Sequence, residues 1–282
     1  MPGILFVVAT PIGNLEDVTL RALRVLRDVA VIAAEDTRRT ARLLQHYSIS
    51  TPTTSLHQHN ERHRTAALLS RLEAGESVAL VSDAGTPVVS DPGRSLVAAA
   101  RAAGIRVEPI PGPSAAIAAL SASGLPAEQF CFVGFPPAKG NDRKRWFSDL
   151  VSEERTLILY EAPHRVRQTL EDLRRALGDR DVAIARELTK THEELVVRPI
   201  SVHLSDDREP RGEYTIVVSP PTEPADIGKT PYDPAVLREE FKTMTGKGFR
   251  PKEAVKDLAA RYRLATRKVY ALVHAEDGHH EA

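Results

Sequence analysis

Four short segments of the sequence combine glycine, proline and acidic residues in a way that suits ligand binding. They are ATPIGNL (9–15), AEDTR (34–38), VSDAGTPVVSDPG (81–93) and PGPSAA (111–116). Each lies at or just beyond the end of a short apolar run that predicts a buried strand. Because glycine and proline mark turns in every fold, ordinary turn chemistry explains any one segment taken alone. Four of them at one edge of one sheet predict a pocket.

The residue types in this predicted pocket argue against a nucleotide phosphate. Gly13 stands alone after the first predicted strand, without a GxGxxG pattern, and the sequence contains no GxxxxGK[ST]. Both patterns gather backbone amides around phosphate groups. S-adenosylmethionine has no phosphate and carries a sulfonium cation, and Asp83 could lie near its hydroxyls or its amine. This elimination favours S-adenosylmethionine. By itself it does not exclude other ligands that lack a phosphate.

The pocket requires a sheet to position it, and the pattern of the first 120 residues predicts one. Strand-like runs alternate with helical patterns at 19–29, 37–47, 60–75 and 94–103. On the inner side of the first helix we expect Leu20, Leu23 and either Val25 or Leu26. The strand-like runs are ILFVVAT (4–10), VIAAE (31–35), SVALVSD (77–83) and IRVEPIP (105–111). Such alternation predicts a mainly parallel sheet covered on both faces, with ligands bound beyond the carboxyl ends of its strands.

A second α/β unit is expected after SASGLP (121–126), which we interpret as a hinge. A helix is predicted over 164–178, with Gly178 at its C-cap position. The strand candidates are FCFVGF (130–135), TLILYEA (156–162), VAIARELT (182–189) and YTIVVS (214–219). Five prolines between residues 220 and 234 predict a linker. We therefore expect an α/β fold with domains at 1–120 and 121–220, a linker at 221–233 and a helical domain at 234–282.

Composition narrows the class of protein. The 38 Lys and Arg balance 38 Asp and Glu, so an anionic partner would have to meet a local basic patch. The single cysteine, Cys131, excludes a disulfide framework and a CxxC zinc site, and it is typical of a reducing compartment. We see neither a signal peptide nor an apolar stretch of membrane-spanning length. These features predict a cytoplasmic protein that does not bind membranes.

Two basic segments could bind nucleic acid. Between Lys242 and His274 the chain has nine Lys and Arg but only two acidic residues, in a pattern that resembles a helix-turn-helix. A solvated pair of surface helices would explain the same pattern. The segment PPAKGNDRKRWF (136–147) also joins basic and aromatic residues, although we expect Trp146 in the core. Its candidate phosphate contacts are Lys139, Arg143, Lys144 and Arg145.

Eight motifs in a characteristic order resemble the ribosomal RNA small subunit methyltransferase I family, within the tetrapyrrole methylase superfamily. Besides the four segments above, they are HQHNE (57–61), YEAPHR (160–165), RELTKTHE (186–193) and GEY (212–214). The resemblance covers about residues 4–219, and the tail resembles that family's C-terminal helical domain. It implies two α/β domains of the tetrapyrrole methylase type with S-adenosylmethionine in the cleft between them. It further implies a homodimer that 2′-O-methylates a decoding-region cytidine of 16S rRNA in the small ribosomal subunit.

The resemblance also implies which residues bind the methyl donor. They come from the first, third and fourth loops and, near two positions, from the second domain. Taken in order they are Pro11, Ile12, Asp83, Gly85, Thr86, Ser114, Ala115, Tyr160 and Ala185.

Methyl transfer to a ribose oxygen requires alignment and removal of a proton, since the sulfonium already activates the methyl group. Glu35 and Asp36 are candidates for a base or a hydroxyl-orienting group, and so are Glu187 and Lys190. N-capping of the helix that starts at Thr37 is an equally good reading of Asp36. Arg38 and Arg39 could bind the phosphate next to the acceptor.

The histidines of HQHNE need a separate interpretation. His57, His59 and His63 are spaced like metal ligands, but only Glu61 adds an acidic partner. The family motif implies no metal. We therefore expect His57 and His59 to contact substrate, or the segment to cap the helix entered at Asn60.

Three rival functions stay open. A methylase of a corrinoid precursor or a diphthine synthase would explain the donor pocket, but neither calls for the basic tail, AEDTR or RELTKTHE. A non-catalytic nucleic-acid-binding protein would use the tail, and it would leave the loop-rich edge of the sheet without a purpose.

Overall fold

The structure is a computed structural model that describes residues 1–207, 209–221, 234–262 and 266–274. The chain forms two compact units, residues 1–220 and 221–282. The predicted linker lies outside the described residues, apart from Pro221. No described helix is both long and apolar enough to cross a membrane.

The first sheet is parallel throughout, as predicted, and its strands follow the order β3-β2-β4-β1-β5. The strands are β1 (Ile4–Val8), β2 (Val31–Ala34), β3 (Thr53–Ser55), β4 (Val78–Val81) and β5 (Arg106–Ile110). The polar strand β3, which apolar patterning did not predict, pairs with β2 at one edge. β1 lies between β4 and β5 in the sheet although it comes before both in the chain. The connection from β1 leads to β2 on one side, and the connection from β4 leads to β5 on the other, so the two connections run in opposite directions from the point between β1 and β4.

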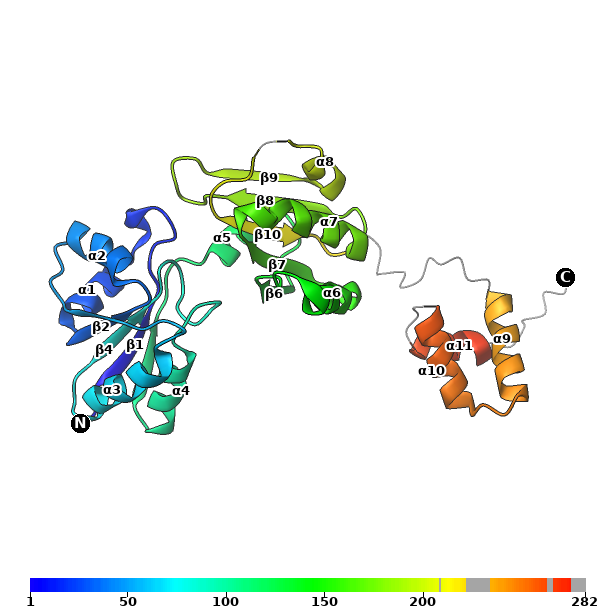
Figure 1. Ribbon diagram of the computed structural model, residues 1–282, viewed down its shortest axis with the longest axis horizontal. Coiled ribbons are helices and arrows are strands. Elements are labelled where there is room, and N and C mark those ends of the chain that lie inside the picture. Colours follow the sequence, from blue (N-terminus) through cyan, green and yellow to red (C-terminus); the bar gives the residue numbers. More distant parts are fainter. Residues whose placement is uncertain (208, 222–233, 263–265, 275–282) are drawn as a thin grey trace. The chain divides into compact units, whose positions relative to one another are not determined.

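Helices cover both faces of this sheet, as predicted (Figure 1). α1 (Leu20–Asp28) and α2 (Thr37–His46) pack on one face, and α3 (Glu61–Glu73) and α4 (Arg94–Ala102) pack on the other. The expectation for Leu20 is wrong, because its side chain is 86% exposed. Residues two apart on a helix point in nearly opposite directions, and α1 buries Ala22 together with Leu23 and Leu26.

The second sheet has the order β6-β7-β10-β8-β9, and only its β6–β7 pair is parallel. Its strands are β6 (Phe130–Gly134), β7 (Thr156–Glu161), β8 (Asp181–Arg186), β9 (Glu194–Pro199) and β10 (Tyr214–Val218). The sequence predicted four of these strands. The fifth, β9, was not predicted and forms one edge of the sheet. Alternate residues serve opposite faces: Leu157 and Leu159 of β7 join one core cluster, while Ile158 joins the other.

Helix α5 (Ala115–Ser123) covers one face of the second sheet, and α6 (Gly140–Asp149), α7 (Val166–Leu177) and α8 (Ile200–Leu204) cover the other. The first half of the predicted hinge is helical, because α5 continues to Ser123 and ends at Gly124, whose φ is +68°. α7 ends at Gly178, as predicted. Three short 3₁₀ turns, Leu15–Asp17, Leu150–Ser152 and Pro163–Arg165, complete the unit.

The second unit is a bundle of α9 (Pro234–Gly246), α10 (Pro251–Arg261) and α11 (Thr266–His274). Leu237, Val255, Leu258 and Val269 form its small apolar core. The sequence pattern predicted a helical domain here.

The prediction that Arg143 of α6 contacts a phosphate is wrong. Its side chain is 5% exposed, and its guanidinium donates to Asp172 at 2.8 Å and to Thr169 at 2.9 Å. Thr169 in turn donates to the buried Glu161, which pairs with Arg165 at 2.7 Å. Arg143 therefore holds α6 against α7, and its charge is not available to RNA. Its neighbours Lys139, Lys144 and Arg145 are exposed.

Replacing Arg143 should destabilise the protein. Arg143→Ala leaves Thr169 without its buried donor and Asp172 with only the exposed Arg175, and loss of one member of a buried pair costs about 3–5 kcal/mol. Urea denaturation should show this loss in the free energy of unfolding. Lys144→Ala, one residue away and exposed, is the matched control and should change the free energy little. Equal stability of the two variants would contradict the proposed network.

Candidate active site

Two loops meet at the carboxyl edge of the first sheet. The backbone amide of Thr10, after β1, donates to the carbonyl of Gly85, after β4, and the amide of Gly85 donates back, both at 2.9 Å. The φ of Gly85 is +76°, a conformation that favours glycine. The hydroxyl of Thr10 also donates to the carbonyl of Ser82 at 3.3 Å. β1 and β4 flank the point where the connections separate, which is where open α/β sheets bind ligands.

A cavity of about 430 Å³ lies at this edge, with walls from both sheets of the first unit. Eight of the nine predicted donor-binding residues line it: Ile12, Asp83, Gly85, Thr86, Ser114, Ala115, Tyr160 and Ala185. The ninth, Pro11, is buried and is not part of the lining. Residues separated by up to 173 positions in the chain therefore share one cavity of a size typical for a small-molecule site.

Hydrogen bonds hold the walls of the cavity together. The hydroxyl of Thr86 donates to the carbonyl of Pro113 at 3.2 Å, which joins the loop after β4 to the loop after β5. The backbone amide of Ala116, in the first turn of α5, donates to the Tyr160 hydroxyl at 3.2 Å. Burial raises the pKa of Tyr160, so the phenol stays protonated at neutral pH.

One wall of the cavity is acidic. Glu35, Asp83 and Asp91 all line it. Burial raises the pKa of Glu35, although the amide of Asp83, 3.4 Å away, partly offsets this effect. Burial, reinforced by the neighbouring Glu35 carboxylate, raises the pKa of Asp91 to about 6. Sequence reasoning missed Asp91, because its position in the turn SDPG suggests only turn formation.

The loop that carries Asp91 has an unusual backbone. Val88 and Ser90 have φ values of +74° and +66°, in the left-handed region. This conformation is rare for a β-branched residue, and such strain is common at ligand sites. Val89, between them, lines the cavity and is 42% exposed.

Asp36 caps a helix, as its alternative interpretation predicted. Its carboxylate accepts from the backbone amide of Arg38 at 2.9 Å at the start of α2, and it also pairs with the Arg38 guanidinium. Arg38 thereby holds the pKa of Asp36 well below its usual range. Asp36 and Arg38 are not part of the cavity lining, whereas Arg39 is, with its guanidinium 3.5 Å from Asp83. The backbone amide of Asp36 donates to the Asp83 carboxylate at 2.9 Å.

Glu187 and Lys190 form a charged cluster beside the cavity. The Lys190 ammonium lies 2.9 Å from Glu187 and 2.9 Å from Glu213, and Glu213 lines the cavity. Burial opposes the charge of Lys190, but its bonds to the two carboxylates outweigh this effect and raise its pKa. Lys190 is therefore a cation at neutral pH and is unsuited to act as a base.

The segment that carries Glu187 and Lys190 also contacts the loop after β1. The Thr189 hydroxyl accepts from the backbone amide of Asn14 at 2.9 Å. A Cβ at Gly13 would lie 2.5 Å from Cγ of Lys190, so only glycine allows this approach. Glu187 and Thr189 both adopt positive φ, at +52° and +67°.

The residues of HQHNE mainly connect helices. Glu61 accepts from the backbone amides of Gly93 and Ser95, at 3.2 and 2.7 Å, and so caps the start of α4. Asn60 precedes α3 without a side-chain capping bond, and its side chain accepts from the amide of His57 at 2.8 Å. The His57 and His59 rings lie 6.0 Å apart, centroid to centroid, outside the cavity lining. Within the described ranges, no group of three or more His, Cys, Asp or Glu could hold a metal ion.

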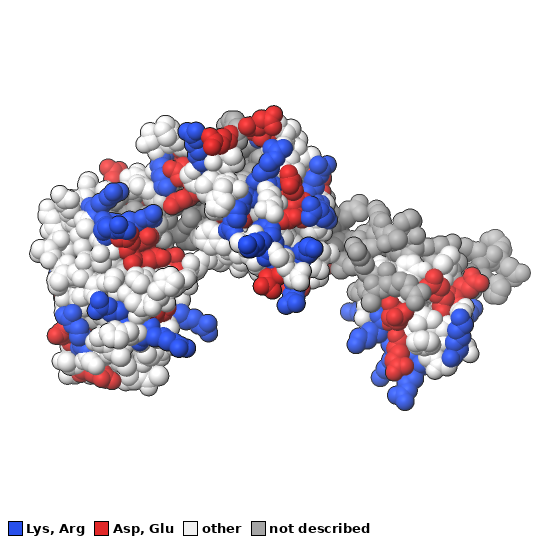
Figure 2. All heavy atoms as spheres, viewed as in Figure 1, with Lys and Arg blue, Asp and Glu red and all other residues white. Residues whose placement is uncertain are grey.

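Basic side chains are visible around α6 and on the second unit (Figure 2). Among the side chains that the structure describes on α9, α10, α11 and the turn between α9 and α10, the exposed basic ones are Lys242, Lys247, Arg250, Lys252, Lys256 and Arg267. Phe249 and Tyr270 of the same unit are exposed as well. This combination suits phosphates and unstacked bases.

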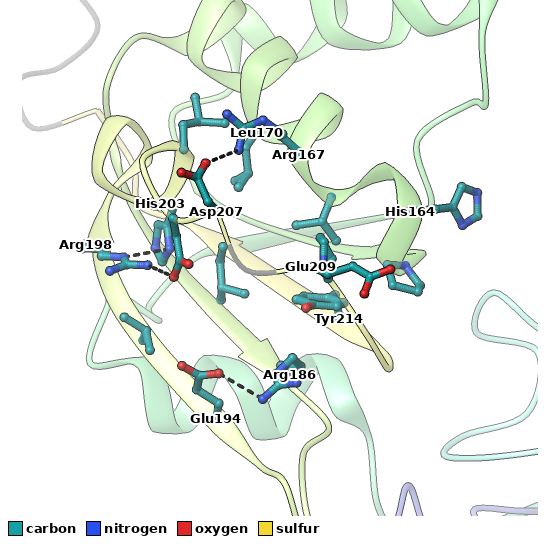
Figure 3. A pocket seen from close by; sticks show the side chains of 17 residues that line it. His164, Arg167, Leu170, Arg186, Glu194, Arg198, His203, Asp207, Glu209 and Tyr214 are labelled. Atoms are coloured by element: carbon teal, nitrogen blue, oxygen red, sulfur yellow. Dashed lines mark hydrogen bonds and ion pairs between the residues drawn. The ribbon is translucent and has the colours of Figure 1, made fainter.

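A second cavity, of about 570 Å³, lies between α7, β8, β9 and the segment after α8 (Figure 3). Its floor is apolar, with Leu170, Ile184 and Val196. Its arginines each lie within 4.0 Å of a carboxylate: Arg167 of Asp207, Arg186 of Glu194 and Arg198 of Asp206. Because these charges neutralise one another and none of the predicted donor residues lines this cavity, the cavity between the two sheets is the better candidate for the active site.

Comparison with known proteins identifies a family. The sequence profile of the Tetrapyrrole (Corrin/Porphyrin) Methylases matches residues 5–202. A Synechocystis protein named Ribosomal RNA small subunit methyltransferase I is 47% identical over 96% of this chain and 97% of its own. Proteins of the same name from Pseudomonas aeruginosa and Halalkalibacterium halodurans are 53% and 43% identical, over 77% and 97% of this chain and 79% and 96% of theirs.

Solved structures share the fold. Diphthine synthase superposes with a TM-score of 0.61 at 14% identity, over 77% of this chain and 90% of its own. Uroporphyrin-III-C-methyltransferase from Thermus thermophilus gives a TM-score of 0.55 at 24% identity, over 77% and 94%. The predicted fold class is confirmed.

The raised pKa of Asp91 predicts a pH-dependent stability. The folded state holds a proton on Asp91 more tightly than the unfolded state does, so the stability that Asp91 contributes below about pH 4 is lost as the pH rises through about 6. Asp91→Asn should therefore increase the free energy of unfolding at pH 7.5 by roughly 1 kcal/mol, a value reduced for solvent screening. Urea denaturation at pH 7.5 and pH 4 measures it. An equal gain at both pH values would contradict the assignment.

Proposed function

Because the chain belongs to the ribosomal RNA small subunit methyltransferase I family of the tetrapyrrole methylases, we propose that it methylates 16S rRNA in the small ribosomal subunit, with S-adenosylmethionine as the donor. We assign the reaction to the ribose 2′-hydroxyl of a decoding-region cytidine. The observation that carries the proposal is the cavity in which eight predicted donor residues from both sheets meet the acidic wall. We further propose that the protein acts as a cytoplasmic homodimer.

The cavity fits the proposed donor in its chemistry. S-adenosylmethionine supplies an activated methyl group on a sulfonium and also carries an ammonium. Asp83 and Asp91 present carboxylates that suit these cations. Ile12, Ala115 and Ala185 provide apolar contacts, and Gly85 lines the cavity with backbone alone, in a conformation with a φ of +76° that favours glycine.

We assign the proton transfer to Glu35. Glu35 lies in the cavity wall, and its raised pKa makes it a better acceptor of the ribose hydroxyl proton than an exposed carboxylate would be. As the O–C bond forms and the S–C bond breaks, the hydroxyl proton passes to the Glu35 carboxylate. Asp36 is less suited, since Arg38 and the helix cap occupy its oxygens. Glu187 is also less suited, since its ion pair with Lys190 helps to hold its pKa low despite burial.

RNA recognition is assigned to cations outside the cavity. Arg39 lies at the cavity wall, where it can neutralise the phosphate next to the acceptor ribose, and the exposed Arg38 lies beside it. Lys139, just before α6, Lys144 and Arg145 on α6, and the basic second unit add further cations for RNA phosphates. His57 and His59 stay candidate substrate contacts.

Glu35→Gln tests the assignment of the base. We expect kcat for methyl transfer to small subunits to fall by about 10²- to 10⁴-fold, because Gln cannot accept the proton. Binding of S-adenosylmethionine, measured by calorimetry, should change little. Asp36→Asn is the matched control, because it keeps an N-cap and should keep most of the activity. Full activity of Glu35→Gln would remove Glu35 as the base, and failure of the wild-type protein to label small subunits would contradict the function itself.

Removal of residues 232–282 tests the role of the second unit. The truncated protein should bind small subunits more weakly, and the logarithm of its affinity should vary less with the logarithm of salt concentration, since fewer phosphates are neutralised. Filter binding at several salt concentrations measures both quantities. Calorimetry with S-adenosylmethionine is the control, because donor binding belongs to the first unit. An unchanged salt dependence would show that the second unit does not contact RNA phosphates.

A further inference from the structure

One wall of the active-site cavity is an exposed aromatic ring. Phe135 lines the cavity and is 50% exposed. Its ring lies 5.5 Å from that of Tyr160, which in turn lies 4.9 Å from that of Phe132. Tyr160 is fixed by its bond to Ala116, so Phe135 rests on a rigid aromatic support.

A β-bulge directs Phe135 into the cavity. Phe132 pairs with Ile158 and Gly134 pairs with Leu159, so Val133 is an extra residue in β6. In a regular strand, residues 132 and 135 would point to opposite faces. Here both rings contact Tyr160. Bulges of this kind often re-aim a side chain beside an active site.

Glycine makes the bulge compatible with the neighbouring wall. Gly134 has a φ of +69°, in the left-handed region, and a Cβ there would lie 3.3 Å from the Ser90 hydroxyl oxygen. The end of β6 therefore lies against the loop that carries Asp91. Val89 of that loop is a second exposed apolar residue in the lining.

The exposed ring suits a second ligand better than the methyl donor. A cavity of about 430 Å³ accommodates a molecule of the donor's class, and the predicted donor residues Ile12, Ala115 and Ala185 are buried or half-buried. Phe135 and Val89 are more exposed than these apolar residues. A donor that binds against the buried residues would leave Phe135 and Val89 uncovered. Such a surface has the shape and chemistry to stack with the flat face of a nucleobase.

We propose that Phe135 stacks with an unstacked base of the acceptor RNA and so presents the neighbouring ribose to the cavity. This inference rests on the proposed function. The same chain segment continues from Phe135 to the exposed Lys139 before α6 and to the exposed Lys144 and Arg145 on α6. The base contact and the adjoining phosphate contacts thus lie on one short stretch of chain.

Phe135→Ala should raise KM for small subunits by about 5- to 150-fold, the range that corresponds to loss of one base–aromatic stack. kcat should change little if the stack is equally strong in the ground state and the transition state. Calorimetry should show an unchanged Kd for S-adenosylmethionine. Phe135→Trp should restore KM, whereas Phe135→Leu, which keeps apolar volume without a flat face, should resemble Phe135→Ala and provides the readout if the alanine variant does not fold.

Phe130→Ala is the matched control. Phe130 begins β6, the strand that ends one residue before Phe135. It is 39% exposed and does not line the cavity, so its loss should leave KM unchanged. A weakened affinity of Phe135→Ala for S-adenosylmethionine would assign the ring to the donor and overturn the proposal. An unchanged KM in both Phe135→Ala and Phe135→Leu would also overturn it. In either case an active wild-type protein would leave the proposed function intact, while an inactive wild-type protein would contradict that function first.

Discussion

The reciprocal backbone hydrogen bonds between Thr10 and Gly85 join two loops that are 75 residues apart in sequence, and the candidate active site depends on this junction. It fixes the loop after β4 next to the loop after β1, so that the following Thr86 reaches the carbonyl of Pro113. On the other side of Gly85, Asp83 accepts from the amide of Asp36 and donates its own amide to Glu35. These backbone hydrogen bonds therefore hold Glu35, which follows β2, and Asp83, which follows β4, in one wall of the cavity. They do so against the mutual repulsion of the two carboxylates.

Contacts between the two lobes of the first unit complete the site. The Tyr160 hydroxyl meets the start of α5, and Thr189 meets Asn14 of the first loop. The strained segment from Glu187 to Thr189 is held by the ion pairs of Lys190 and approaches Gly13 closely enough to exclude any larger residue. Neither sheet alone encloses the cavity. This arrangement explains why the residues that line it are scattered along the chain.

Sequence patterns predicted most of the fold, because strong apolar periodicity reports burial directly. They predicted the strands of the first sheet except β3 and those of the second sheet except β9. β3 is short and polar, and β9 lies at an edge, where the alternation is weak. Arg143 was misassigned because a basic residue near an aromatic looks the same in sequence whether it faces solvent or packs between two helices. Asp91 and Phe135 were missed because their roles depend on a turn that buries one carboxyl and on a bulge that redirects one ring.

Mass mapping of 16S rRNA tests the central claim most directly. Small subunits isolated from cells that lack this methyltransferase would be incubated with the protein and isotopically labelled S-adenosylmethionine. Nuclease fragments of the rRNA would then be analysed for methylated ribose. We predict one labelled 2′-O-methyl group, on a cytidine of the decoding region. Label on a base, on another rRNA region or on a ribosomal protein would contradict the account.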